Sequence, residues 1–313
     1  MLPHRLMSCR RTALACLAVL ALPAAAQPAG AQICERRLLA ENSLRDDDGF
    51  ITTPVVIAGQ AASLLVDTGS DDGLLTEAGA LWLGLAQDPG HRTVMQGTGG
   101  TGRTVRNVRL PGIAIGALHL PGASLPVGAL PALPVVTPPV AGLLGADMLS
   151  RFDVELDLPQ HRIRFWRIQA GSDLCAPPPV WDGRYDSIPL ERHGDRVMLD
   201  ARLDGQPITV LLDSGARSRI LSMQAAARLG VDAERLGADP GGITAGVDLH
   251  ETPYHWHRFR SLAIGADTQA HPVLTVAPLA EPVDLLLGAD WFATRDVWIS
   301  YATNRLLVRP GLR

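Results

Sequence analysis

The chain contains the same short phrase twice, and this duplication constrains its fold more than any other feature. Residues 64–70 read LLVDTGS and residues 210–216 read VLLDSGA. In each copy an apolar run ends in an aspartate, a hydroxyl residue and a glycine. The copies lie 146 residues apart in a chain of 313 residues. We infer that two halves of the chain each bring one carboxylate, Asp67 and Asp213, to a shared place.

The likeness between the halves extends beyond these phrases. The turn signals at 58–60 and 204–206 recur at the same offset, as do the Leu-Gly pairs at 83–84 and 229–230. The sequence LLGAD occurs at 143–147 and again at 286–290. A repeat of this length is far longer than the unit of a solenoid, so it indicates a duplicated domain.

Composition and pattern favour strands over helices. The chain has 31 glycines and 24 prolines, which interrupt short apolar runs. Paired runs flank the turns near residues 59 and 205, as in β-hairpins. Short helices are predicted near 76–83 and 222–229, where Ser222 is suited to cap the second helix. We therefore predict an all-β fold with a few short helices.

The first residues have the pattern of a secretory signal peptide. Three arginines precede an apolar run at 13–22, and small residues follow it. Cleavage after Ala26 fits this pattern best, with cleavage after Ala31 as the alternative. A membrane anchor is the alternative, but the run is about half of the roughly 20 residues that span a bilayer. The sequence thus predicts a protein exported to the periplasm or secreted, with no membrane anchor in its mature form.

The remaining chain divides at a proline-rich segment. We expect an N-terminal lobe over 27–169, a linker over 170–184 and a C-terminal lobe over 185–313. Cys34 and Cys175 remain after signal cleavage, and in an oxidising compartment they would form one disulfide, with two free thiols as the alternative. The net charge of −4 without a basic block argues against nucleic acid as a partner.

Two facing carboxylates can activate water. If Asp67 and Asp213 meet in a cleft of low dielectric constant, both cannot stay ionised, so the pair would share one proton. The ionised member would take a proton from a water as that water attacks a carbonyl group. The protonated member would donate to the carbonyl oxygen. This chemistry requires no metal and no cofactor.

These motifs resemble those of the aspartic peptidases, and most closely the retropepsin-like branch with two lobes in tandem. The resemblance implies a bilobal β fold around a cleft, acting as a monomeric endopeptidase on peptide or protein substrates. It makes Asp67 and Asp213 the catalytic pair. It assigns support of the active loops to Thr68, Gly69, Ser70, Ser214, Gly215 and Ala216. It assigns packing behind the loops to Leu144, Gly145, Leu287 and Gly288.

The resemblance also implies flaps, which are hairpins that close over a bound peptide. The glycine-rich stretches provide the expected positions, at Gly97, Gly99 and Gly100 in the first lobe and at Gly242 and Thr244 in the second.

Other interpretations use the same residues. The lobes could bind peptides without cleaving them. The phrase at 66–70 also resembles the phosphate loop of actin-like ATPases and sugar kinases. Asp67, Asp71 and Asp72 lack the ligand spacing of a calcium loop. His255 and His257, with His250, could bind zinc, but they fall in a stretch that is typical of a strand. Asp147 and Asp290 fit structural roles in the first turn of a short helix.

Overall fold

Strands form most of the structure, which confirms the predicted all-β fold. The computed structural model describes residues 35–97, 100, 102–169, 181, 183–247 and 249–309. All of them belong to one unit, Ile33–Arg313. The predicted signal peptide, Cys34, Cys175, Gly99 and most of the predicted linker lie outside the described residues.

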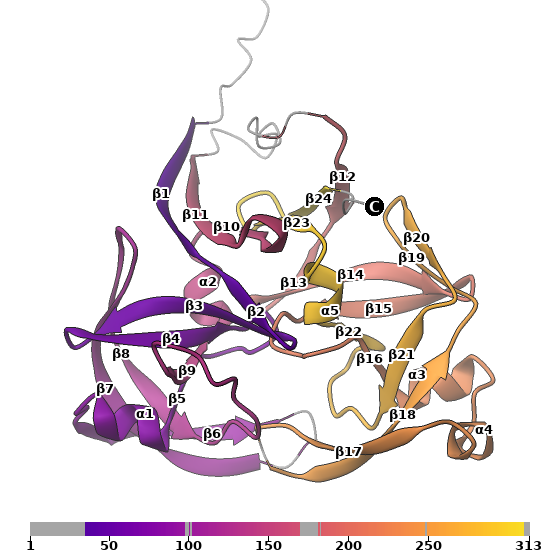
Figure 1. Ribbon diagram of the computed structural model, residues 1–313, viewed down its shortest axis with the longest axis horizontal. Coiled ribbons are helices and arrows are strands. Elements are labelled where there is room, and N and C mark those ends of the chain that lie inside the picture. The colour runs from indigo at the N-terminus through magenta and orange to yellow at the C-terminus, as the bar shows by residue number, and fades with distance from the viewer. Residues whose placement is uncertain are drawn as a thin grey trace, which may run out of the picture. The chain divides into compact units, whose positions relative to one another are not determined.

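The first lobe is built on an eight-stranded sheet with the order β2-β3-β4-β9-β5-β8-β7-β6 (Figure 1). Its strands are β2 (Arg45–Asp47), β3 (Phe50–Ile57), β4 (Gln60–Val66), β5 (Leu74–Thr76), β6 (Gln87–Gln96), β7 (Gly102–Ile115), β8 (Leu118–Gly128) and β9 (Val140–Leu144). Helices α1 (Glu77–Trp82) and α2 (Ala146–Leu149) follow β5 and β9.

The second lobe is built on a ten-stranded sheet with the order β17-β18-β21-β16-β22-β15-β14-β19-β20, and β13 pairs with β14. Its strands are β13 (Glu191–His193), β14 (Arg196–Leu203), β15 (Gln206–Leu212), β16 (Ile220–Ser222), β17 (Gly241–Ala245), β18 (Glu251–Arg258), β19 (Ser261–Ile264), β20 (Asp267–Ala270), β21 (Val273–Ala277) and β22 (Leu285–Leu287). Its helices are α3 (Met223–Arg228), α4 (Ala233–Gly237) and α5 (Ala289–Phe292).

The same local rules shape both lobes. The hairpins β3–β4 and β14–β15 turn through two residues with positive φ, at Ala58 and Gly59 and at Asp204 and Gly205. Such turns match the twist of the paired strands. Each lobe then adds a parallel strand, because β4 pairs with β9 and β15 with β22. The predicted cap is confirmed, since the hydroxyl of Ser222 accepts from the N–H of Ala225 in the first turn of α3 at 3.1 Å.

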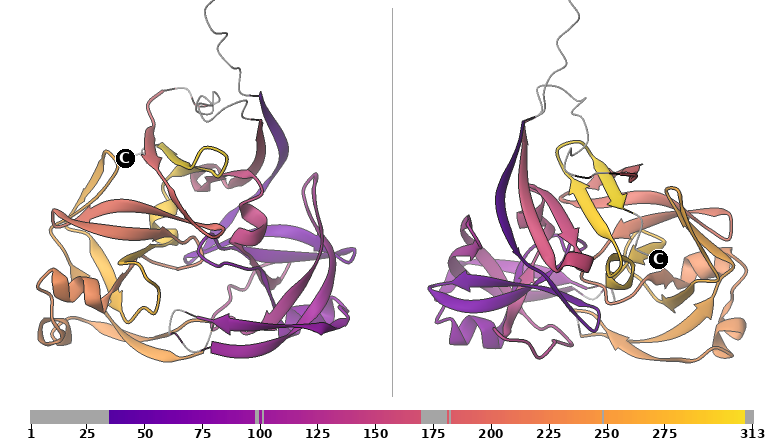
Figure 2. Two further views of the ribbon diagram at one scale, coloured as in Figure 1. Left: turned by 180° about the vertical axis from the view of Figure 1, so that it is seen from behind. Right: turned by 45° about the horizontal axis from the view of Figure 1, so that its top comes forward.

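A third sheet joins the two halves of the chain. It has the order β1-β11-β10-β23-β24-β12, and β10 pairs antiparallel with β23 (Figures 1 and 2). The first half gives β1 (Glu35–Ser43), β10 (Asp153–Asp157) and β11 (Arg162–Gln169), and the second gives β12 (Asp186–Pro189), β23 (Asp296–Ser300) and β24 (Arg305–Arg309). A 3₁₀ turn, η1 (Leu158–Gln160), connects β10 to β11. Two self-contained lobes would not share a sheet in this way.

One apolar core runs through both lobes. Leu64 and Leu144 in the first lobe and Leu212 and Leu287 in the second are almost fully buried members of this core. These residues belong to the strands that lead into the two aspartate loops or support them, so each loop is attached to a rigid base. No helix in the described part of the chain combines the length and apolar character needed to cross a membrane.

Candidate active site

Asp67 and Asp213 stand immediately after the buried strands β4 and β15. The N–H of Asp67 donates to the carbonyl oxygen of Leu144 at 3.0 Å, and that of Asp213 to Leu287 at 3.2 Å. The parallel strands β9 and β22 thus hydrogen-bond to the chain one residue beyond the ends of β4 and β15. These bonds hold the backbone of each aspartate in place. Asp67 is half-buried and Asp213 is buried.

The hydroxyl residues after the two aspartates lock the loops together. The Oγ1 of Thr68 donates to the carbonyl oxygen of Leu212 at 2.7 Å and accepts from the N–H of Ser214 at 3.0 Å. Reciprocally, the Oγ of Ser214 donates to the carbonyl oxygen of Val66 at 2.7 Å and accepts from the N–H of Thr68 at 3.1 Å. Both side chains are buried, so breaking this exchange would leave polar backbone groups without partners.

The loop glycines allow the two carboxyl groups to meet. A Cβ placed on Gly69 would lie 2.4 Å from the Cγ of Asp213, and one on Gly215 would lie 2.2 Å from the Cγ of Asp67. Any other residue would collide with the opposite aspartate. The structure therefore brings together the two carboxylates that the sequence places 146 residues apart, and they are close enough to hydrogen-bond to each other.

Backbone N–H groups orient each carboxylate. The Oδ1 of Asp67 accepts from the N–H groups of Gly69 at 3.0 Å and Ser70 at 2.9 Å. The Oδ1 of Asp213 likewise accepts from Gly215 at 3.1 Å and Ala216 at 3.0 Å. Ser70 and Ala216 thus orient the carboxylates through their backbone, and the hydroxyl of Ser70 also donates to the carbonyl oxygen of Asp72 at 2.9 Å.

Burial changes the acidity of both groups. Burial, together with the charge of Asp67, raises the pKa of Asp213 to about 8. Burial also raises the pKa of Asp67, but the loop N–H groups and the positive charge of Arg196 oppose this increase. Glu281 acts in the other direction on Asp213 and raises its pKa further. Burial therefore favours the protonated form of both carboxyl groups, and the charge of Asp67 adds to this effect on Asp213.

The glycines of the two LLGAD segments lie against the backbone of the aspartate loops. A Cβ on Gly145 would lie 2.4 Å from the backbone of Asp72, and one on Gly288 would lie 2.2 Å from the carbonyl oxygen of Ser218. The adjoining aspartates anchor the ends of the loops, and both lie in the first turn of a helix. Asp147 accepts from the N–H of Gly73 at 2.9 Å, and Asp290 accepts from the Nε of Arg219 at 2.8 Å.

The glycine-rich stretches belong to two hairpins. Gly97 and Gly100 lie in the connection between β6 and β7, and Gly100 approaches the 278–284 loop of the second lobe, where its Cβ would be 2.8 Å from that of Ala280. Gly242 and Thr244 lie within β17 rather than at the end of its hairpin with β18. Val247, nearer that end, packs on an apolar cluster of the first lobe that includes Leu65 and Leu143. Each hairpin therefore contacts the opposite lobe.

Arg196 is a site residue that sequence reasoning missed. It begins β14 in the second lobe, yet its Nε lies 2.9 Å from Asp71 in the first active loop. Its Nη1 donates to the carbonyl oxygen of Gly69 at 3.4 Å and to Glu281 at 3.0 Å. The side chain is only 9% exposed. No local motif surrounds Arg196, so only the tertiary contact shows its place.

The second active loop also takes part in a salt bridge between the lobes, but here the loop supplies the arginine and the first lobe supplies the aspartate. Arg217 occupies the position in the second loop that Asp71 occupies in the first, and it contacts Asp48 of the first lobe at 2.6 Å. Its guanidinium group also lies 4.7 Å from the ring centre of Phe50. The charges around the two loops are therefore not equivalent.

Among the described residues, two of the side chains considered as metal ligands have other partners. No group of three or more His, Cys, Asp or Glu there could hold a metal ion. His257 contacts Asp239 at 2.6 Å, and Asp71 contacts Arg196.

Comparison with known proteins agrees with this geometry. Residues 53–148 and 199–291 each match the family model described as aspartyl protease. The two matches together cover more than half of the chain, and each contains one aspartate loop and its LLGAD segment. A search of the curated proteins gives no match. The chain therefore belongs to the aspartyl protease family.

Proposed function

We propose that this protein is an endopeptidase in which Asp67 and Asp213 activate one water molecule for attack on a peptide bond. The observation that carries this proposal is the reciprocal packing of each loop glycine on the opposite carboxylate. It brings together two carboxyl groups, and on this proposal they would share one proton, as acid–base hydrolysis requires. The match to the aspartyl protease family supports the same reaction class.

The charges around the pair indicate a division of roles. Arg196 stabilises the anion of Asp67, whereas Glu281 disfavours ionisation of Asp213. Asp67 would therefore be the base that takes a proton from the water. Asp213 would be the acid that donates a hydrogen bond to the substrate carbonyl oxygen, where negative charge develops. Afterwards the proton gained by Asp67 can pass to the leaving amine.

The substrate would be an extended peptide held under the two hairpins. Both hairpins reach the opposite lobe, so their closure would exclude water from the reacting bond. We place the reaction after export, on the basis of the predicted signal peptide at residues 1–26. We also propose that one chain supplies the whole site, since both aspartates come from it.

Cleavage of an unfolded protein or a peptide library tests the proposal. We expect wild type to cleave at acidic to neutral pH and a statine-type inhibitor to block it. Asp67→Asn and Asp213→Asn should each lower kcat by at least about a thousandfold while the circular dichroism spectrum stays unchanged, because each removes one partner of the proton exchange. Asp200→Asn, on the exposed side of β14, is the matched control and should retain activity.

Two outcomes would redirect the proposal. Full activity in either active-loop variant would mean that the dyad is assigned wrongly. Saturable peptide binding by wild type without any cleavage would instead favour the peptide-binding alternative. The phosphate-loop alternative predicts retention on immobilised ATP, which we do not expect.

A further inference from the structure

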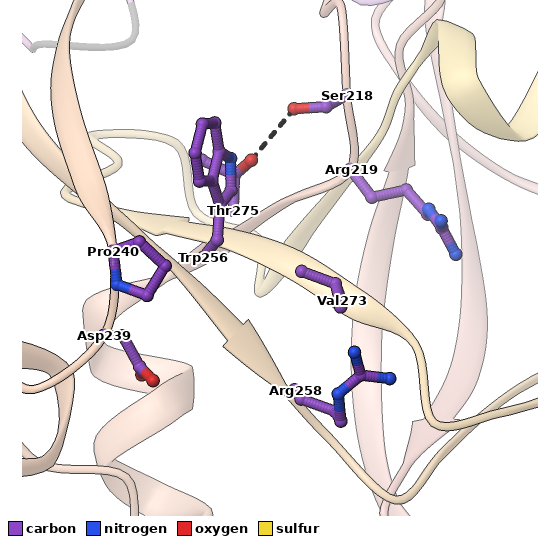
Figure 3. Close-up of a pocket in the computed structure, with 8 residues that line it drawn as sticks. All are labelled: Ser218, Arg219, Asp239, Pro240, Trp256, Arg258, Val273 and Thr275. Atoms are coloured by element: carbon purple, nitrogen blue, oxygen red, sulfur yellow. Dashed lines mark hydrogen bonds between the residues drawn. The ribbon is translucent and has the colours of Figure 1, made fainter.

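A cavity of about 540 Å³ lies in the second lobe beside the loop that carries Asp213 (Figure 3). Ser218, at one side of the cavity, follows Asp213 by five residues in the chain. Trp256 and Arg258 of β18 form another side, and Val273 and Thr275 of β21 form the floor. Because β18 also belongs to the hairpin proposed to cover the substrate, the cavity lies between two elements of the proposed cleft.

The cavity is on the face of the sheet that points away from the core of the lobe. Leu274 and Val276 of β21 are buried in that core, so the alternate residues Val273 and Thr275 face the other side. Trp256 pairs with Thr275 and therefore shares their face. The indole is 46% exposed and Val273 is 42% exposed, which leaves apolar surface available to a ligand.

The equivalent place in the first lobe is filled. Leu75 pairs with Val127 as Leu221 pairs with Val276, and this register aligns Asn107 with Trp256 and Arg109 with Arg258. Asn107 is 4% exposed, accepts from Thr93 at 3.0 Å and donates to Ser124 at 3.2 Å. Arg109 faces the carboxylate of Asp88 at 3.6 Å. A polar network thus occupies in one lobe the place that is open in the other.

The charges in the cavity leave one cation available. The guanidinium group of Arg219 is bound to Asp290 and Gln269 and points away from Trp256 (Figure 3). Asp239 contacts His257 at 2.6 Å. Arg258 donates to the carbonyl oxygen of His271 at 3.3 Å and, among the described residues, is paired with no carboxylate. An indole beside an unpaired guanidinium group suits a ligand with an aliphatic stem and a carboxylate.

We propose that this cavity is a one-sided subsite that binds a carboxylate of the substrate peptide between Arg258 and Trp256. This inference rests on the proposed function, because it places the carboxylate in the same extended peptide whose bond the two aspartates cleave. The two lobes repeat the same strand plan around the aspartate pair, so the backbone plan alone gives a bound peptide no preferred direction. A carboxylate site in one lobe alone would select one direction.

Peptide binding without turnover tests the subsite. The probes are fluorescent mixtures of extended peptides with amidated C-termini that carry one Glu or one Gln at each position in turn. Binding to the Asp213→Asn protein is measured by anisotropy. We expect Glu to bind about threefold to tenfold more tightly than Gln at one position only, and less so at high salt, as for a partly exposed charge-assisted hydrogen bond.

Three variants identify the group responsible. Arg258→Gln should abolish the preference for Glu, and Trp256→Ala should weaken binding of both peptide series. Arg109→Gln, the counterpart in the first lobe, should leave the preference intact. A second series with free C-termini and no Glu distinguishes the source of the carboxylate: a preference for the free terminus that needs Arg258 would place the chain end in the cavity.

The outcomes separate this inference from the proposed function. Equal binding of all series, no measurable binding, or the same loss in Arg109→Gln as in Arg258→Gln would overturn the subsite. Cleavage by wild type without any carboxylate preference would overturn the subsite and leave the peptidase function standing. A carboxylate preference that depends on Arg258, without cleavage by wild type, would support the subsite and overturn the peptidase function.

Discussion

Arg196 and Glu281 make two similar aspartates chemically different. The Thr68 and Ser214 exchange is almost symmetric, so the loop backbone alone gives Asp67 and Asp213 equal roles. Arg196 touches only the first loop, and its counterpart across the pair is the salt bridge of Arg217 with Asp48. The difference between the two carboxyl groups therefore comes from single charged side chains, and it is the basis of the acid and base roles that we propose.

This polarity predicts separate shifts in the pH profile of kcat/KM. Arg196→Gln removes a positive charge near Asp67, so the pKa of Asp67 should increase and the acidic limb should move upward by about half to one pH unit. Glu281→Gln removes a negative charge near Asp213 and should move the basic limb downward. Arg202→Gln, on the exposed end of β14, is the control and should shift neither limb.

Arg196→Lys distinguishes this role from a structural one. Lysine retains the charge, so the acidic limb should return toward its wild-type position even if kcat stays reduced. A uniform loss of rate with both limbs unchanged would show that Arg196 only braces the loop.

The residues of the site differ in how far sequence could predict them. Asp67 and Asp213 were predictable because duplication displays each with its loop and its LLGAD support. Arg196 was not, because it lies 127 residues from Gly69 in the chain and pairing between lobes creates the contact. The cavity at Trp256 was equally hidden, since its chemistry depends on which side chains share one face of β18 and β21.

At the scale of elements, the hairpin of β6 and β7 shows that a glycine-rich sequence does not define the bounds of its strands. The glycine-rich stretch after residue 95 was expected to hold a hairpin, and the chain does turn after Gln96 and return from Gly102, so that β6 and β7 pair. The glycines do not indicate where the two strands begin and end, which is set by the pairing of β7 with β6 on one side and with β8 on the other. Strand β8 and helix α4 carry no distinctive pattern and were not predicted.

The contact of the second hairpin with the first lobe gives a test of closure. Val247→Thr replaces a methyl group by a hydroxyl on the apolar cluster, which disfavours the closed hairpin by about 1 kcal/mol. We expect KM for peptides to increase about fivefold and kcat to change little. Ile243→Thr, 64% exposed on the same hairpin, should leave KM unchanged. Equal effects of the two substitutions would show that the contact of Val247 does not govern closure.

At the scale of the molecule, the third sheet makes the two halves one folding unit. The internal repeat reveals the two halves of the chain because their sequences are alike. Likeness alone does not show which strands of one half pair with strands of the other. The structure shows that β10 pairs with β23 and that both halves contribute to one core. Strand β10 also carries three buried acids, Asp153, Glu155 and Asp157, next to Asp296 of β23.

Three carboxyl groups with raised pKa values in the folded protein predict that stability falls as pH increases. Burial raises the pKa of Asp213 to about 8, of Asp296 to about 7 and of Asp147 to about 6. Between about pH 4 and pH 8 the folded protein keeps protons that the unfolded chain has released, so the free energy of unfolding decreases with pH. Each unit of pKa difference corresponds to about 1.4 kcal/mol, so a shift of a single unit already produces a decrease that urea unfolding can measure.

Asp296→Asn isolates one part of this effect outside the active site. Asp296 is buried, and its Oδ1 has no hydrogen-bond partner in the described structure. Asparagine cannot ionise, so it removes the cost of keeping this carboxyl group protonated. In an inactive Asp67→Asn background, urea unfolding should show a shallower fall in stability between pH 5 and pH 8 for the Asp296→Asn protein, with the gain over its parent greatest at pH 8. A stability that increases with pH in the parent, or a constant difference between the two proteins, would mean that Asp296 ionises normally and that the Arg309 guanidinium group, 3.6 Å away, compensates its charge.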